Sequence, residues 1–220
     1  MGLGRDNAPK TYLKLNTKEE KPVFKVYEKN AETGKYQHTQ SETFVSGYFK
    51  SINFQIDEFK GETTEVFNLT LTDDGMDYVI KSSLSMVGRG ILNTLCSYPE
   101  LGLVKISLAT RSKEGKSFPT AYLTINGDDR PKWKLSIEEQ MELTKVTKLR
   151  DRTDYDRYEL HQKIKEMCSI LKPAEDNILN TVSPELKKAG KQVGDYLKSQ
   201  TLETKKEEPS YYEEDDDLPF

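Results

Sequence analysis

Hydrophobic and polar side chains alternate along much of residues 22–126, as they do in β-strands that bury one face. Asp74 and Gly75 interrupt this alternation with a pair of residues typical of a tight hairpin turn. The spacing of apolar residues becomes nearly helical at 86–98, and Pro99 ends that run. The pattern therefore predicts a short helix at 86–98 and strands at 22–29, 41–61, 64–74, 76–85, 101–111 and 118–126.

The segment 41–61 alternates over an unusual length, yet neither of its two faces is apolar throughout. Phe49 belongs to one face, whereas Ile52 and Phe54 belong to the other. Gly47 lies within the same run, and a glycine inside a strand often marks a bulge or a sharp bend. We therefore expect a coiled or bulged strand that changes its inward face midway, of the kind that closes a small barrel.

The order of the predicted elements is three strands, a short helix and two strands, with one further strand ahead of them. This order is typical of an OB-fold, a five-stranded barrel that is closed in part. Other small mixed α+β sheets would leave a similar pattern. The expected fold class is thus mainly β with an α extension: an OB-fold-like barrel, C-terminal helices and a disordered acidic tail.

The expected organisation has four parts. Polar residues at 1–21 predict a flexible N-terminal arm, and residues 22–135 form the β domain. Amphipathic helices are expected over 136–171, followed by a last helix from Ser183 to about residue 198, so that 136–199 is a helical extension. Residues 200–220 have no core pattern and predict a disordered tail.

Charge is distributed unevenly along the 220 residues. The net charge is −4, but residues 207–220 hold seven acids and no base, so removing −7 leaves +3 on the other 206 residues. Charged residues make up 32% of the chain and hydrophobic residues 35%, which concentrates the core in part of the sequence. An acidic tail on a mildly basic body suggests that the body meets a polyanion for which the tail competes.

The sequence lacks the residue patterns of several kinds of functional site. His38 and His161 have no cysteine or carboxylate at metal-ligand spacing, so we expect no metal or other cofactor. Cys96 and Cys168 are far apart in sequence and are expected to be buried thiols in a reducing cytoplasm. The sequence has no phosphate-binding loop motif, and because it has no long apolar run we expect neither a signal peptide nor a membrane span. We therefore expect a non-enzymatic cytoplasmic protein.

Outward positions of the β domain combine aromatic and basic residues. Aromatic rings stack on nucleic-acid bases of any sequence, while Lys and Arg follow the phosphates. Taken singly, an aromatic residue on a strand usually belongs to the core, so the expectation rests on the set. Trp133 is the strongest single candidate because its two flanking lysines disfavour burial. The candidate DNA-binding residues are Tyr48, Lys50, Tyr78, Lys81, Lys105, Arg111, Lys113, Lys116, Phe118, Tyr122, Lys132, Trp133 and Lys134.

The chain ends in five acids followed by an apolar tripeptide. The last six residues are Asp215, Asp216, Asp217, Leu218, Pro219 and Phe220. This ending resembles the C-terminal tip of bacterial single-stranded DNA-binding proteins. The resemblance covers about these six residues, and it implies that the tip docks on proteins of DNA replication, recombination and repair. The Phe220 ring could fill an apolar pocket, its carboxylate could pair with a basic residue, and the acids could steer the tip toward a basic rim.

Two features depart from the bacterial proteins. An arm of about twenty residues precedes the β domain, and some sixty residues of helical pattern stand where those proteins have a Gly-, Pro- and Gln-rich linker. The layout resembles a phage-encoded version more closely, which implies the cytoplasm of a bacterial host. The helices could pack on the barrel, form a homo-oligomer interface or extend the DNA groove.

The sequence therefore leads us to expect a single-stranded DNA-binding protein whose residues 22–135 coat the strand without sequence specificity. Its tail would recruit partners and would shield the groove when DNA is absent. The alternative is a protein-interaction adaptor without a nucleic-acid role, which the weak charge of +3 on the body favours.

Overall fold

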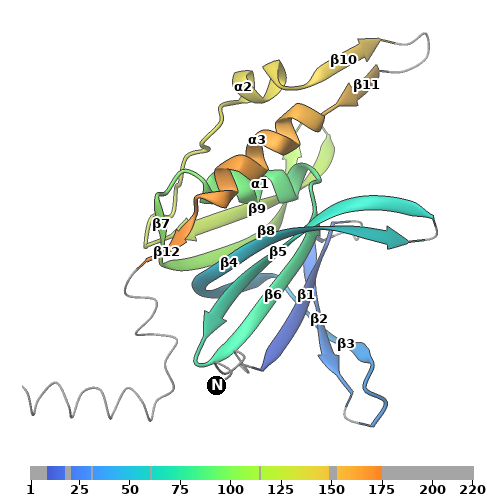
Figure 1. The fold of residues 1–220 in the computed structure, drawn as a ribbon, viewed down its shortest axis with the longest axis vertical. Coiled ribbons are helices and arrows are strands. Elements are labelled where there is room, and N and C mark those ends of the chain that lie inside the picture. The colour runs from blue at the N-terminus through green and yellow to red at the C-terminus, as the bar shows by residue number, and fades with distance from the viewer. Residues whose placement is uncertain are drawn as a thin grey trace, which may run out of the picture. The chain divides into compact units, whose positions relative to one another are not determined.

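The computed structural model of the chain describes residues 9–17, 21–30, 32–59, 61–113, 115–148 and 153–174. Within them the fold is mainly β, with three helices (Figure 1). The helices are α1 (Met86–Leu95), α2 (Ile137–Glu142) and α3 (Tyr158–Ser169). The strands are β1 (Lys10–Asn16), β2 (Val23–Lys29), β3 (Tyr36–Glu42), β4 (Phe44–Phe59), β5 (Glu62–Asp73), β6 (Met76–Ser83), β7 (Glu100–Leu101), β8 (Leu103–Lys113), β9 (Lys116–Ile125), β10 (Lys145–Lys148), β11 (Thr153–Asp156) and β12 (Lys172–Pro173).

Eight strands form one curled sheet in the order β3-β2-β1-β6-β5-β4-β8-β9. Neighbours in this sheet are antiparallel except β1 and β6, which are parallel. The turn between β5 and β6 holds Asp74 at φ 46° and Gly75 at φ 77°, as expected of a tight hairpin. Two short pairs, β10 with β11 and β7 with β12, complete the strand pairing of the described residues.

The long strand β4 changes its inward face through a bulge. Phe49 pairs with Leu71 and Ser51 pairs with Thr70, so the extra residue between them shifts the register. Phe49 is buried before the shift, and Ile52 packs against the core after it. A Cβ at Gly47 would lie 3.1 Å from the carbonyl oxygen of Thr72 and from Leu71 Cβ, so a glycine allows β5 to approach closely here. The predicted change of inward face in β4 is confirmed.

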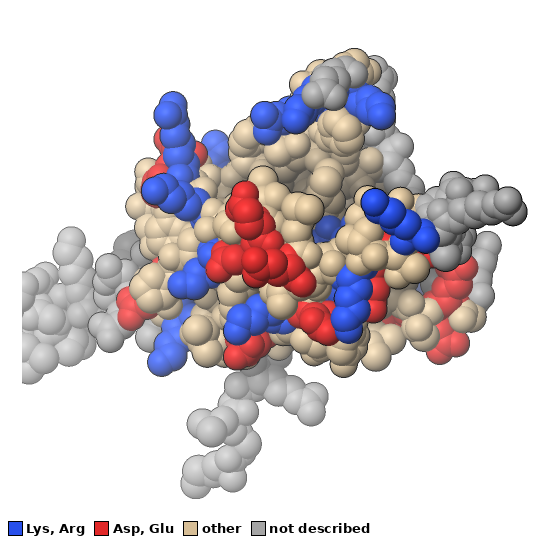
Figure 2. All heavy atoms as spheres, turned by 90° about the horizontal axis from the view of Figure 1, so that it is seen from above, with Lys and Arg blue, Asp and Glu red and all other residues tan. Residues whose placement is uncertain are grey.

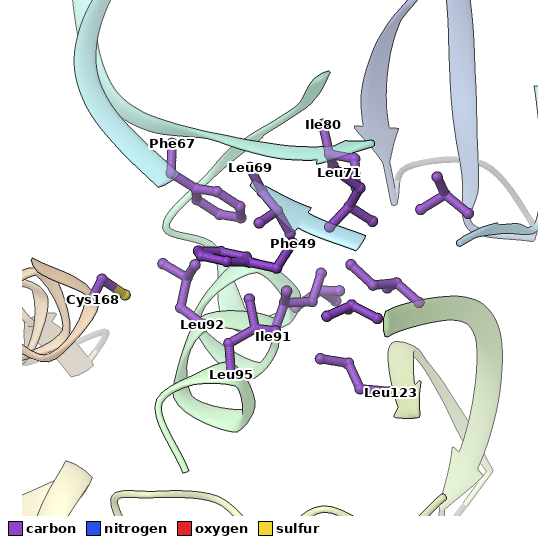
Figure 3. Packing of buried hydrophobic residues seen from close by; sticks show 14 of the residues in the cluster. Phe49, Phe67, Leu69, Leu71, Ile80, Ile91, Leu92, Leu95, Leu123 and Cys168 are labelled. Atoms are coloured by element: carbon purple, nitrogen blue, oxygen red, sulfur yellow. The ribbon is translucent and has the colours of Figure 1, made fainter. Parts of the chain in front are cut away.

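The core lies between one face of the sheet and α1. Phe49, Phe67 and Leu69 project from the sheet toward Ile91 and Leu92 of the helix (Figure 3). Ser85 begins α1 by accepting a hydrogen bond from the Gly88 N–H, at 3.4 Å. Apolar residues of α3 then cover α1, and they are Leu160, Ile164 and Cys168.

The cysteines are buried as expected. Cys168 Sγ lies 3.5 Å from Cys96 Sγ, and both are free thiols at the contact between α3 and the end of α1. The hydrogen bond between the two thiols and their burial raise the pKa of Cys168.

Two sequence-based expectations about the elements are wrong, and one strand was not predicted. Residues 10–16 do not belong to a flexible arm, because they form β1 between β2 and β6. Residues 36–42 form the edge strand β3, although its side chains are almost all exposed and show no apolar alternation. Within 136–171, the β10–β11 hairpin separates the two helices. The helix expected at 183–198 and the tail lie outside the described residues.

Candidate nucleic-acid interface

The sheet has a second face, directed away from the core, which we call the outer face. The register places side chains of β4, β8 and β9 in rows across it. Phe44 pairs with Ser107, which pairs with Tyr122, so one row crosses all three strands. Farther along β8, Arg111 pairs with Phe118 of β9. Aromatic side chains from two non-consecutive strands therefore share this part of the outer face.

The aromatic residues of these rows are exposed to solvent. Their exposed fractions are 51% for Phe44, 56% for Tyr122 and 39% for Phe118. The Lys105 Nζ atom lies 5.3 Å from the centre of the Phe44 ring, within the range of a cation–π contact. We refer to Phe44, Lys105, Arg111, Phe118 and Tyr122 as the β4–β8–β9 patch.

Two lysines extend the patch to the end of the β8–β9 hairpin. Lys113 and Lys116 are paired across the two strands, and both are exposed. The turn between them contains Gly115 at φ 73°, a backbone conformation that glycine adopts without steric cost. The structure thus brings six of the predicted residues into one area, namely Lys105, Arg111, Lys113, Lys116, Phe118 and Tyr122.

The centre of the outer face is more polar, and its lysines are engaged in ion pairs. Lys50 Nζ lies 3.1 Å from an oxygen of Asp77, whose side chain is buried. Lys81 Nζ lies 2.6 Å from an oxygen of Asp57, and this hydrogen bond is the main reason that the pKa of Asp57 is lowered. Tyr48 is half-buried beside this region. Lys50 and Lys81 would have to exchange these partners to bind a phosphate.

Tyr78 is not on the outer face. It pairs with Leu71 on the neighbouring strand, and its ring packs against the core. The expectation that Tyr78 points outward is therefore wrong. The outward neighbour on β6 is Asp77, which is buried and forms an ion pair with Lys50. A buried acid next to a half-buried tyrosine makes the two faces of this strand hard to tell apart in sequence.

The segment with Lys132, Trp133 and Lys134 lies beside α1 and apart from the β4–β8–β9 patch. The side chain of Asn93 on α1 donates to the carbonyl oxygen of Leu135 and accepts from its N–H, at 2.9 and 2.7 Å. The carbonyl oxygen of Asn93 accepts a third hydrogen bond, from the N–H of Lys134. These contacts hold the segment on the side of the sheet that α1 covers. Trp133 is 49% exposed there, and its role in binding stays a prediction.

Sequence reasoning missed Phe44 as a site residue. Phe44 begins the longest of the described strands, and only Thr43 separates it from β3. Ser46 and Tyr48 follow it on the same face of β4. The alternation in 41–61 contained this signal, because it placed Phe44 and Tyr48 together. The contact with Lys105 depends on the pairing of β4 with β8, which no local pattern reveals.

Charge is mixed on the face of the molecule that is seen from above in Figure 2. Figure 2 shows lysines and arginines interspersed with acids on the face that it presents, without a continuous basic area. In the described part of the chain, His, Cys, Asp and Glu side chains do not gather in groups of three that could hold a metal ion. Helices of the described residues are all too short or too polar to cross a membrane.

No protein-family model matches the chain, and searches of characterised proteins and of solved structures found no match. The predicted docking tip, residues 215–220, lies outside the described residues.

Proposed function

We propose that this protein binds single-stranded DNA without sequence preference across the β4–β8–β9 patch. The observation that carries the proposal is the exposure of three aromatic rings beside Lys105 and Arg111 on three adjoining strands. Exposed rings on a rigid sheet offer stacking surfaces for unpaired bases, and the cations follow the phosphate backbone. A duplex offers no free base faces, so the same patch favours single strands.

An OB-fold relationship accounts for the arrangement of the strands. In this proposal β4, β5, β6, β8 and β9 are the five barrel strands, with α1 between the third and the fourth. The pairing of β4 with both β5 and β8 supports this assignment, because the first strand of an OB-fold pairs with the second and the fourth. One difference is that β6 pairs with β1, so among the described pairings the barrel is open between β6 and β9.

The biological role follows from the tail together with the patch. The protein coats exposed strands during replication, recombination and repair in a bacterial host, as a phage-encoded protein would, and its tip from Asp215 to Phe220 recruits partner proteins. The charge of −7 on residues 207–220 supports a tail that is drawn to basic surfaces on partners and on the body.

Fluorescence anisotropy with labelled oligo-dT and with a duplex of equal length tests the proposal. We expect tighter binding to the single strand, and we expect Tyr122→Ala to weaken it by about 1–3 kcal/mol, the usual contribution of a stacked base. Tyr36→Ala is the matched control, because Tyr36 is also an exposed tyrosine but lies on β3 at the opposite edge of the sheet. Equal or absent binding to both DNA forms would favour the adaptor function instead.

A further inference from the structure

An open pocket of about 610 Å³ lies where α1 and α3 begin. The start of α1 contributes Met86 and Arg89, and the start of α3 with the end of β11 contributes Tyr155, Arg157 and Tyr158. These two segments are about seventy residues apart in sequence. The pocket lies on the side of the sheet that the helices cover, so it is separate from the β4–β8–β9 patch.

The guanidinium groups of Arg89 and Arg157 share the pocket, and no described residue supplies a carboxylate partner for them. Arg89 donates a 2.7 Å hydrogen bond to the carbonyl oxygen of Leu84, which fixes its position at the pocket wall. Among the described residues, neither Arg89 nor Arg157 forms an ion pair. Asp156 also lines the pocket, but its carboxylate accepts the N–H of Tyr158 at 2.9 Å. The pocket therefore contains more positive than negative charge.

The positive charges of the pocket add to the effect of burial on two pKa values. Burial lowers the pKa of Arg89, and the charge of Arg157 lowers it further. His161, which also lines the pocket, has its pKa lowered by burial and next by the charge of Arg89. Its Nε2 atom is buried and has no hydrogen-bond partner among the described residues. An anion in the pocket would offset the repulsion between these groups.

Exposed rings border the same pocket. Tyr158 is 67% exposed, and Tyr155 and Met86 are more than half exposed. The Arg157 guanidinium lies 5.0 Å from the centre of the Tyr155 ring, so the ring orients the cation. The ligand that fits has an anionic group for the arginines and a flat ring for Tyr158, and a nucleotide has both in one unit.

We propose that this pocket binds one nucleotide, with its phosphate between Arg89 and Arg157 and its base against Tyr158. The nucleotide could come from two sources, a DNA strand or a free mononucleotide. Both present a phosphate for the arginines and a base for Tyr158. Only the first source rests on the proposed function. In that case the pocket is a second subsite that lengthens the strand path beyond the outer face.

Isothermal titration of the full chain with thymidine 5′-monophosphate tests the pocket, with thymidine and inorganic phosphate as the partial ligands. We expect the monophosphate to bind about tenfold or more tightly than either part, because charge-assisted contacts and stacking act together. Arg157→Gln and Tyr158→Ala should each weaken it about fivefold or more. Arg130→Gln and Tyr36→Ala, which change exposed residues elsewhere, should leave it unchanged.

Arg157→Lys keeps the charge but loses the planar fork, so a partial loss of affinity with an unchanged thermal unfolding midpoint separates binding from folding. Wild-type affinity of Arg157→Gln and Tyr158→Ala for the monophosphate would overturn the proposal. So would binding of a peptide of residues 207–220 at the pocket with no binding of the monophosphate.

Oligo-dT titrations distinguish the two sources of the nucleotide and the two proposals. If Arg157→Gln weakens both long oligo-dT and the monophosphate, the pocket takes a nucleotide of the strand. If it weakens the monophosphate alone, the ligand is a free nucleotide. If Tyr122→Ala leaves oligo-dT binding unchanged while Arg157→Gln weakens it, the β4–β8–β9 patch is wrong and the pocket stands. If Tyr122→Ala weakens oligo-dT binding while Arg157→Gln leaves it unchanged, the pocket is not a subsite for the strand and the β4–β8–β9 patch stands.

Discussion

Lys105 and Phe44 are joined across two antiparallel strands, with the ammonium nitrogen 5.3 Å from the ring centre. The pair is exposed. Tyr122 lies in the same row as Phe44, on β9, with β8 between the two strands. A cation held over one ring, with a second ring in the same row, is an arrangement that suits a base and its phosphate. This relationship motivates the first two predictions.

Phe44→Ala should weaken binding of oligo-dT by about 1–3 kcal/mol, because the change removes one stacking ring while the rest of the patch remains. The ring is half exposed, so its loss should leave the thermal unfolding midpoint nearly unchanged. Anisotropy titrations with oligo-dT measure the affinity. An affinity within error of the wild type would place Phe44 outside the binding surface.

Lys105→Gln should reduce the salt dependence of single-strand binding. A lysine that neutralises one phosphate contributes roughly 0.7 to the slope of log K against log salt concentration for single strands. Lys163→Gln is the control, because Lys163 pairs with Glu166 on the exposed side of α3. Titrations over a salt series measure both slopes. A slope equal to that of the wild type would show that Lys105 contacts no phosphate.

Deletion of residues 207–220 should tighten single-strand binding, because it removes a charge of −7 that competes with DNA for basic side chains. Deletion of residues 218–220 alone keeps all the acids and should leave the affinity close to that of the full chain. Gel shifts at low and moderate salt compare the three proteins. Unchanged or weaker binding after the longer deletion, across the salt series, would contradict the competition.

Gly88→Ala should destabilise the fold, whereas Gly90→Ala should not. A Cβ at position 88 would lie 2.2 Å from the carbonyl oxygen of Ser83, so α1 would have to move away from the end of β6, at a cost of about 1–3 kcal/mol. A Cβ at position 90 meets nothing within 4 Å, and alanine favours a helix over glycine by about 0.5–1 kcal/mol. Urea unfolding of both variants measures the difference. Equal stability of the two would refute the close approach at Gly88.

His161 should make the folded state less stable in mild acid. Burial lowers its pKa in the folded protein, with Arg89, Arg157 and Lys165 acting in the same direction and Glu65 opposing them. The unfolded chain therefore takes up the proton first, so stability falls as the pH drops below about 6.5, the usual histidine value. Urea unfolding at neutral and mildly acidic pH should show a larger loss for the wild type than for His161→Gln. Parallel losses would show that another group is responsible.

Local patterns in the sequence predicted the central strands and α1 because each buries one regular face. The bulge in β4 was predictable for the same reason, since Phe49 and Ile52 could face one core only if the strand changed phase between them. The strands β1 and β3 were not predictable, because β1 buries only Leu13 fully and β3 buries no side chain fully. Their backbone partners, and not their side chains, make them strands.

The candidate site shows the same division. Alternation by itself placed Lys105 and Tyr122 on outward positions, because their neighbours Val104, Ile106 and Leu123 are apolar and buried. Only the tertiary structure decided that Phe44 joins them, since strand pairing brings together residues about eighty positions apart.

Tertiary contacts also decided the placement of the other candidates. Asn93 fastens the segment around Trp133 to α1, a contact over 42 residues that local sequence does not encode. The pocket of Arg89 and Arg157 likewise exists only because α3 packs against α1. Periodicity along a chain reports which side of an element is buried, whereas the partner of each element depends on the free energy of the whole packed core.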